Sequence, residues 1–310
     1  MLAYLARRLL QSVAVTFVVL SLVFVAGRIL GDPVRLVVGI EASEERVQKV
    51  REQLNLNQPL GQQYANFIGD ALSLQFGTSF WQKVPALPRV LERIPATLTL
   101  TAAALALALP LGITLGALSA LRPWSRIDRV TNVISLGGVS IVEFWLALML
   151  ILIFPVRLGW FKTSGYGGIE YFVLPALTLC YKPLGRIAQI TRSAMLDELA
   201  KPYVKAARAR GLAERRVVFV HALKNAAVPV LTISGDELAA LLNGAIIVET
   251  VFGWPGIGRL TIQALERRDL PMVEATVFVV AIFIIVTNLL VDMAYTWLNP
   301  RIRFSAAGDA

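Results

Sequence analysis

Six long apolar stretches constrain the fold of this chain more than any other feature of its sequence. They lie near residues 9–29, 96–121, 130–154, 172–194, 226–250 and 273–298. A helix needs about 20 apolar residues to cross the hydrocarbon core of a bilayer, and charged residues make up only 16% of this chain. The sequence therefore predicts an all-α polytopic membrane protein with six transmembrane helices. It excludes ordinary soluble enzymes and disordered chains.

The first apolar stretch follows a short basic segment, residues 1–8. A secretory signal peptide would have a shorter apolar core followed by a small-residue cleavage site. This stretch is instead 21 residues long and is followed by Gly31–Pro33, so we interpret it as the first transmembrane helix. The predicted domains are the N-terminus with this helix (1–30), an external loop domain (31–94), a five-helix core (95–304) and a tail (305–310).

The polar region 31–94 has its own helical signals. Ser43, followed by two glutamates, is typical of a helix start, because a hydroxyl caps free N–H groups and acids favour the positive end of the dipole. We expect helices over about 44–54 and 62–74, and then a loop over 77–95. The region is too short for a large core of its own.

The excess of basic residues predicts the orientation. A net charge of +9 could indicate nucleic-acid binding in a soluble protein. In a membrane protein it indicates the positive-inside bias, so we expect lipid and no nucleic acid as a partner. Among the short loops, 15 Lys and Arg lie on one side and 5 on the other. Both termini are therefore predicted to be cytoplasmic, with 31–94 facing outward.

The chain offers little for catalysis or metal binding. It has one cysteine, Cys180, and one histidine, His221, which rules out a disulfide within the chain and makes a Cys/His metal site a poor hypothesis. A membrane-embedded enzyme would need a nucleophile–base pair. The phosphate-loop pattern G-x-x-x-x-G-K-[ST] is absent from the sequence, so we expect no ATP hydrolysis and no cofactor in this chain.

The loop 197–224 carries a distinctive helix signal. Pro202 suits the first helical position, where a missing N–H costs nothing, and Gly211 suits the position after the helix end, where φ is positive. We predict a helix over 202–210 and a second from about Glu214. A basic loop held near anionic lipid is an equally open interpretation on pattern alone, against docking into a groove of another protein.

These residues carry a family resemblance. Ala206-Ala207 followed after three residues by Gly211 is similar to the core of the EAA loop, which marks permease subunits of binding-protein-dependent ATP-binding-cassette importers. Other segments resemble the dipeptide/oligopeptide/nickel permease subfamily: ERIPATL (92–98), TRSAMLDEL (191–199), YVKAARARGL (203–212), HALKNAAVP (221–229), IVETVFGWPGIGRL (247–260) and NLLVDMAYTWLNPRIR (288–303).

The chain departs from the family pattern in places. Lys205 stands where the general loop has Glu, as in many peptide permeases, and the usual Pro is displaced to Pro229. Lys182-Pro183 and Asp236-Glu237 are unusual for the subfamily and bear on the substrate range.

The resemblance implies a type I ABC-importer permease in a bacterial inner membrane. Its partners would be a second homologous permease, two ATPase subunits that bind ATP and Mg, and an extracytoplasmic substrate-binding protein. It implies a peptide substrate, with nickel or glutathione as alternatives. It also implies an ATPase-coupling helix whose contact residues are Tyr203, Val204, Lys205, Ala206, Ala207, Arg208, Gly211, Leu212 and Arg215.

Ionisable residues inside predicted spans are costly and face a pathway or one another. Five such residues form a candidate translocation pathway or buried charge network: Glu143, Lys182, Arg186, Asp236 and Glu237. Interhelical pairing is the favoured interpretation. Direct contact with the charged ends of a peptide is the alternative.

The glycine-rich segment 253–258 predicts a tight turn between the last two spans rather than a ligand site. The resemblance implies that it lies near an external gate formed by Glu249, Trp254, Pro255, Gly256 and Gly258. Two rival transport classes remain, an ion-coupled secondary transporter using buried carboxylates and a passive channel. Neither has a reason to possess the helix at 203–212.

Overall fold

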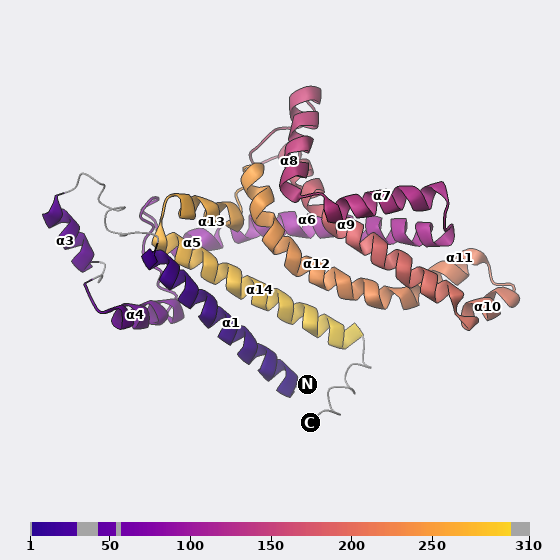
Figure 1. Ribbon diagram of the computed structural model, residues 1–310, viewed down its shortest axis with the longest axis horizontal. Helices are drawn as coiled ribbons and strands as arrows, with labels where there is room; N and C mark the ends of the chain where they lie inside the picture. The colour runs from indigo at the N-terminus through magenta and orange to yellow at the C-terminus, as the bar shows by residue number, and fades with distance from the viewer. Residues whose placement is uncertain (1, 30–42, 54–56, 299–310) are drawn as a thin grey trace. The chain divides into compact units, whose positions relative to one another are not determined.

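The computed structural model describes residues 2–29, 43–53 and 57–298 (Figure 1). The predictions for residues 30–42 and for the tail 305–310 lie outside the described residues. Within the described ranges every regular element is a helix, and the only extended pairing is an isolated bridge between Thr78 and Pro85. The predicted all-α class is confirmed. The chain divides into two compact units, Met1–Pro95 with Pro255–Val286, and Ala96–Trp254 with Thr287–Ala310.

The first unit holds the helices of the N-terminal region and those that follow the last glycine-rich segment. They are α1 (Leu2–Ile29), α3 (Glu44–Gln53), α4 (Leu60–Leu72), α5 (Ala86–Leu91), α13 (Ile257–Glu266) and the first part of α14 (Leu270–Leu298). Aromatic side chains join α1 to α4: the Phe24 ring lies 5.3 Å from Tyr64 and 5.5 Å from Phe67. The helices predicted at 44–54 and 62–74 correspond to α3 and α4.

Two predictions for this unit need correction. The loop expected over 77–95 contains helix α5, whose Ala86 and Val90 are fully buried. These residues are four apart and share one helical face, so packing of that face against the core stabilises the helix. The sequence alone suggested a loop because three prolines lie in or beside the segment. The segment after Gly253 is not a simple turn, because α13 lies between α12 and α14.

A buried carboxylate anchors the loop before α5. Asp269, between α13 and α14, is fully buried and accepts hydrogen bonds from the Ser79 hydroxyl and from the backbone N–H groups of Phe80 (2.9 Å) and Trp81 (3.2 Å). A buried carboxylate is stable only when donors surround it. The loop 79–81 is therefore held against the α13–α14 junction.

The second unit is built around α9. Its elements are α6 (Ile94–Leu121), α7 (Arg126–Ser140), α8 (Glu143–Ile151), the π-helical η1 (Leu152–Leu158), α9 (Ile169–Ala200), α10 (Pro202–Ala209), α11 (Glu214–Arg216), the π-helical η2 (Val217–Ala222) and α12 (Leu223–Val251). Helix α9 packs against α7, α8 and α12. The core includes Leu100, Leu179, Ile187 and Phe252, all almost completely buried.

Three helical segments among the described residues are long and apolar enough to cross a membrane: Ala86–Leu121, Glu214–Val251 and Leu270–Val291. The stretch predicted as one helix at 130–154 is instead two helices, α7 and α8, bent by 109°. Ile141 between them is extended, with φ −79° and ψ 127°, which breaks the helical hydrogen-bond series. Counting that pair as one span gives four, and the total of six spans stays a prediction.

Candidate functional site

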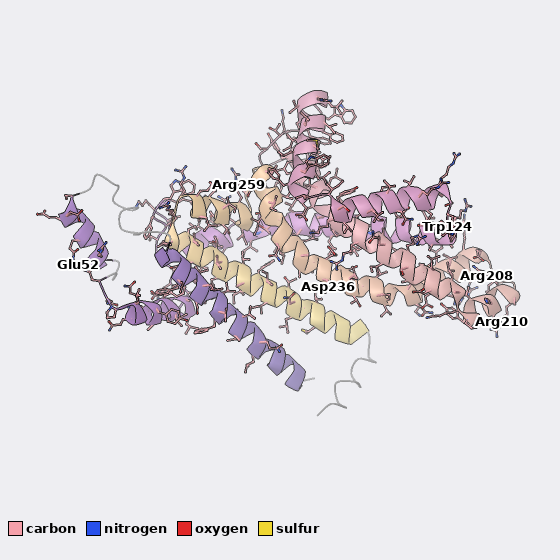
Figure 2. All side chains as sticks on the ribbon, viewed as in Figure 1. Glu52, Trp124, Arg208, Arg210, Asp236 and Arg259 are labelled. Carbon is pink, nitrogen blue, oxygen red and sulfur yellow. The ribbon has the colours of Figure 1, made fainter. Side chains whose placement is uncertain are left out.

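The predicted helix after residue 200 is present and exposed. Lys201 is extended (φ −69°, ψ 149°) and separates α9 from α10, which begins at Pro202. Gly211 adopts φ +74°, the left-handed conformation expected after a helix end. Val204 is the buried residue of α10. We call Pro202–Arg215 the α10 segment; Figure 2 labels Arg208 and Arg210 on it.

Polar contacts tie the start of α10 to two long helices. The Tyr203 hydroxyl donates to Glu198 Oε2 near the end of α9 (2.7 Å) and accepts from Asn225 Nδ2 near the start of α12 (3.0 Å). Lys201 Nζ lies 2.5 Å from Glu198 Oε1. Tyr203 thus links both neighbours of the α10 segment, so α10 cannot shift at this end without disturbing α9 and α12.

The same contacts shift two pKa values. Burial raises the pKa of Glu198, but hydrogen bonds from Lys201 and Tyr203 stabilise the carboxylate more strongly, so the pKa lies below its ordinary value. Burial is also the main reason that the pKa of the Tyr203 hydroxyl is raised. At neutral pH the Glu198 carboxylate is therefore ionised and accepts both hydrogen bonds.

An ion pair closes the other end of the segment. Arg208 Nη2 lies 2.6 Å and Arg208 Nε 3.1 Å from the two carboxylate oxygens of Glu214. Such a two-point contact fixes orientation as well as distance. It spans the turn at Gly211, while Lys205, Ala206 and Arg215 stay exposed and Ala207 and Leu212 are partly exposed. The exposed surface of the α10 segment therefore carries basic side chains and small ones.

A small apolar cluster lies among the helices that adjoin the segment. It consists of Ala117, Ala120, Met195, Val218, Ala222 and Ala226, drawn from α6, α9, η2 and α12. Val218 and Ala222 are four residues apart in the π-helical η2 and are essentially buried. Helix α10 contacts α9 and η2, so it adjoins two of the elements from which this cluster is built.

The charged residues predicted inside the spans form two pairs. Arg186 Nη1 lies 2.9 Å from Glu237 Oε1, and Lys182 Nζ lies 3.6 Å from Glu143 Oε1. The Glu237 and Glu143 side chains are 2% and 15% exposed, whereas those of Arg186 and Lys182 are about half exposed. Asp236, labelled in Figure 2, is exposed and does not share the burial of its neighbour. The pairs therefore bury the acids and leave the cations accessible.

The residues expected at an external gate include a buried cluster. The fully buried Glu249 accepts a hydrogen bond from the Thr97 hydroxyl (2.6 Å). Trp254 Nε1 donates to the Ala96 carbonyl (2.9 Å), and the Tyr166 ring meets the Trp254 ring edge to face at 4.7 Å. The cluster fastens the end of α12 to the start of α6. Pro255, Gly256 and Gly258 belong to the other compact unit, where Gly256 precedes α13.

Sequence reasoning missed several members of these contacts. Thr97 and Asn225 have partners 152 and 22 residues away, and no local pattern announces such pairs. Glu198 and Glu214 could have been found, since each is an acid within six residues of a basic or tyrosine partner. Cys180 is buried, and among the described residues no three His, Cys, Asp or Glu side chains are placed to hold a metal.

With this geometry in place, comparison with known proteins identifies the chain. The sequence model described as "binding-protein-dependent transport system inner membrane component" matches residues 112–304, and the N-terminal model of the same system matches residues 1–101. The chain belongs to this family. It is a permease subunit of an ABC importer, and all the site residues described above that lie after Gly112 fall within the larger match.

Relatives cover nearly the whole permease. The glutathione transport system permease protein GsiC of Escherichia coli (strain K12) is 38% identical over 305 residues, covering 98% of this chain and all of that protein. A putative peptide transport system permease protein of Brucella abortus (strain 2308) is 36% identical over 313 residues, with the same coverage.

Solved structures share the fold. An amino acid ABC transporter crystallised with histidines has a TM-score of 0.54 and 19% identity, covering 67% of this chain and 93% of that one. The MetNI methionine ABC transporter in an inward-facing conformation has a TM-score of 0.56 and 18% identity, covering 68% and 96%. The permease is accordingly a multi-pass membrane component of a transport complex.

Proposed function

We propose that this permease forms half of the translocation pathway of an ATP-driven peptide importer. A second, homologous permease would form the other half, and two ATPase subunits that bind ATP and Mg would drive alternating access. The names of the relatives support peptide or glutathione as substrate; nickel is a further alternative within the subfamily. The observation that supports this most strongly is the α10 segment, an exposed helix tied to α9 and α12 at its start and followed by a turn that an internal ion pair spans.

The α10 segment is proposed to couple this subunit to an ATPase. Coupling requires a part that keeps its shape when pushed, so that displacement reaches the long helices. The Tyr203 contacts tie the helix to α9 and α12, the Arg208–Glu214 ion pair orients the turn after it, and the exposed Lys205, Ala206 and Arg215 offer a contact surface. The surplus of basic residues in the loops of one side supports placing this segment and both termini in the cytoplasm of a bacterial cell.

The charge pairs are proposed to line the pathway. Half-exposed cations at bilayer depth are too costly to face lipid, so Lys182 and Arg186 are expected to face the pathway or the partner permease. Neutralising both partners, Arg186→Gln with Glu237→Gln, should change the KM for a peptide while the complex still assembles. If uptake and KM stay at wild-type values, these residues do not line the pathway.

The loop held by Asp269 is a proposed docking surface for the extracytoplasmic substrate-binding protein. Trp81 is 43% exposed, and the Arg267 guanidinium lies 5.2 Å above its ring. Lys83 and Arg268 are exposed beside them in sequence, each with positive φ. An aromatic ring with a stacked arginine is the composition of an interface anchor, and the cations favour an acidic partner surface.

Reconstitution tests the proposal. The permease, a homologous partner permease, the ATPases and the binding protein would be co-expressed, purified as one complex and placed in liposomes. Uptake of labelled trialanine and of labelled glutathione should require ATP and the binding protein. Uptake that proceeds without the ATPases and collapses with an uncoupler would instead identify an ion-coupled secondary transporter. Leakage that needs no energy source would identify a channel.

A further inference from the structure

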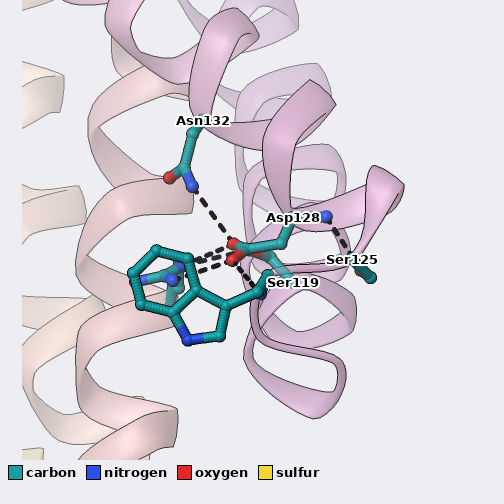
Figure 3. Close-up of polar contacts among 6 residues, drawn as sticks. Ser119, Ser125, Asp128 and Asn132 are labelled. Carbon is teal, nitrogen blue, oxygen red and sulfur yellow. Dashed lines mark hydrogen bonds and ion pairs between the residues drawn. The ribbon is translucent and has the colours of Figure 1, made fainter.

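One buried carboxylate joins the helices α6, α7 and α9 of the second unit. It takes no part in the contacts of α10 described above. Asp128, near the start of α7, is buried. Its donors are the Ser119 hydroxyl at the end of α6, Trp124 N (2.8 Å), Asn132 Nδ2 (3.1 Å), and Nε (2.7 Å) and Nη2 (3.0 Å) of Arg192 on α9. Figure 3 labels Ser119, Asn132 and Asp128 itself. The two nitrogens of Arg192 engage both carboxylate oxygens, which fixes the guanidinium plane.

The turn between α6 and α7 is shaped by the same group. Ser125 caps α7 by accepting a hydrogen bond from the backbone N–H of Asp128 (3.2 Å). Trp124 adopts φ +68°, a conformation that L side chains rarely take, and its N–H is held by the Asp128 carboxylate. A carboxylate in the first turn of a helix also complements the helix dipole. The carboxylate thus fixes both the turn and the start of α7.

Glycines allow α6 and α7 each to approach α9 closely. A Cβ added to Gly116 of α6 would lie 2.5 Å from the Ala188 carbonyl of α9, and one added to Gly112 would lie 2.8 Å from an atom of Ile187. A Cβ on Gly138 of α7 would lie 2.6 Å from the Tyr181 carbonyl of α9. Small residues four apart allow such backbone approach between membrane helices. Helices α6 and α7 therefore both pack closely on α9, and the Asp128 contacts join all three at the α6–α7 turn; we call this the three-helix block.

Arg192 sits on α9 eight residues before its end at Ala200, about 12 Å of continuous helix. Helix α10 follows after Lys201. We propose that Asp128 and Arg192 are positioning residues that make the three-helix block move as one body when α10 is displaced, and so set how much substrate moves per ATP hydrolysed. This inference rests on the proposed coupling function.

A different result is expected if the Asp128–Arg192 pair only stabilises the fold. Losing it would lower the yield and thermal stability of the complex, and the surviving complexes would transport and hydrolyse ATP in the usual proportion. If the pair instead transmits movement, its loss would let α9 rotate against α7 and α6 when α10 is displaced. ATP hydrolysis would then continue without proportional transport, so the ratio of the two rates is the informative quantity.

The test uses the complete complex in liposomes, with whichever of trialanine or glutathione the wild type takes up. Three variants alter the contact. Asp128→Asn keeps the shape of the side chain but removes its charge, and Arg192→Lys keeps the charge but loses the two-nitrogen contact of the guanidinium. Ser119→Ala removes one donor and is compatible with a helix. Arg129→Gln is the matched control, because Arg129 is exposed on the same turn and its side chain is not among the Asp128 donors. Uptake, ATP hydrolysis and the KM for ATP are measured on equal amounts of assembled complex.

We expect Asp128→Asn to lower the transport-to-hydrolysis ratio about fivefold or more, the lower end of typical coupling effects, with the KM for ATP unchanged. Arg192→Lys and Ser119→Ala should give smaller falls, and Arg129→Gln none. If Asp128→Asn does not assemble, the other two variants decide the question. Wild-type ratios in assembled variants would overturn the inference. A wild-type complex that hydrolyses ATP but moves neither solute would instead overturn the proposed function.

Discussion

Gly211 allows the proposed lever to be tested by backbone conformation alone. Its φ of +74° lies in the left-handed region, and a Cβ built on it meets no atom within 4 Å. An alanine there adds no clash, so its cost is only the left-handed conformation, about 1–2 kcal/mol. Asparagine adopts this conformation more readily. Gly211→Asn should therefore behave almost as wild type, and Gly211→Ala should be mildly impaired.

Proline at the same position faces three separate obstacles. Its φ is fixed near −65°, it lacks the N–H that Gly211 donates to the Arg208 carbonyl (2.9 Å), and it pushes the preceding Arg210 toward extended ψ, away from its bridge-region backbone (φ −79°, ψ 3°). Together these cost about 3 kcal/mol or more, which lowers the population of the native turn by more than about 100-fold. The ion pair between Arg208 and Glu214 across this turn would be lost with it.

We therefore expect Gly211→Pro to abolish uptake and substrate-stimulated ATP hydrolysis while membrane insertion stays intact. Uptake into liposomes and ATPase rates are measured for all three variants, with size-exclusion chromatography of the permease as the control for insertion and folding. Normal transport by Gly211→Pro would refute the coupling role. Equal loss for alanine and proline would show that contact with another surface, rather than backbone conformation, decides the outcome.

Three further predictions follow from buried contacts. Trp254→Phe keeps an aromatic ring but removes the indole N–H that donates to the Ala96 carbonyl, so the stability of the purified permease should fall by about 0.5–1.5 kcal/mol, seen as a lower thermal midpoint; an unchanged midpoint would contradict this. The pKa of Glu198 in the folded protein is held below its ordinary value of 4.5, so the ionised carboxylate stabilises the fold. This contribution is complete above the ordinary pKa and is lost as the pH falls through the folded-state pKa. Glu198→Gln should thus lower thermal stability at neutral pH and converge with wild type only in acid. Asp269→Asn should release the Trp81 loop and weaken binding of the substrate-binding protein, seen in equilibrium binding to the complex; equal affinity would argue against the docking surface.

The parts of the fold that local chemistry controls were predictable. Pro202 and Gly211 delimit α10 to within one residue of the prediction, because a missing N–H and a positive φ are properties of single residues. The break between α7 and α8 was not predictable from hydropathy, since the apolar run continues through Ile141. Helix α5 was missed because its stability comes from burial of Ala86 and Val90 in a core that the sequence pattern does not display.

The candidate site could also be predicted only in part from the sequence. Charges placed inside predicted spans drew attention to Glu143, Lys182, Arg186 and Glu237 before their partners were known, because an ionisable group at that depth needs one. The pairing itself, Arg186 with Glu237 and Lys182 with Glu143, depends on how α9 packs against α8 and α12. No spacing along one helix encodes that choice.

The contacts around α9 support a distribution of rigidity that bears on mechanism. Near one end, Tyr203 ties α10 to both α9 and α12, and Asp128 ties α9 to α7 and α6. Midway, the Arg186–Glu237 pair joins α9 to α12 through a half-exposed cation, a contact that water can exchange more readily than a buried one. The Asp128–Arg192 pair is better shielded, with side chains 3% and 25% exposed. Of these two ion pairs on α9, the one less accessible to water therefore lies nearer the segment that would receive force, and the more accessible one lies where a pathway would have to open.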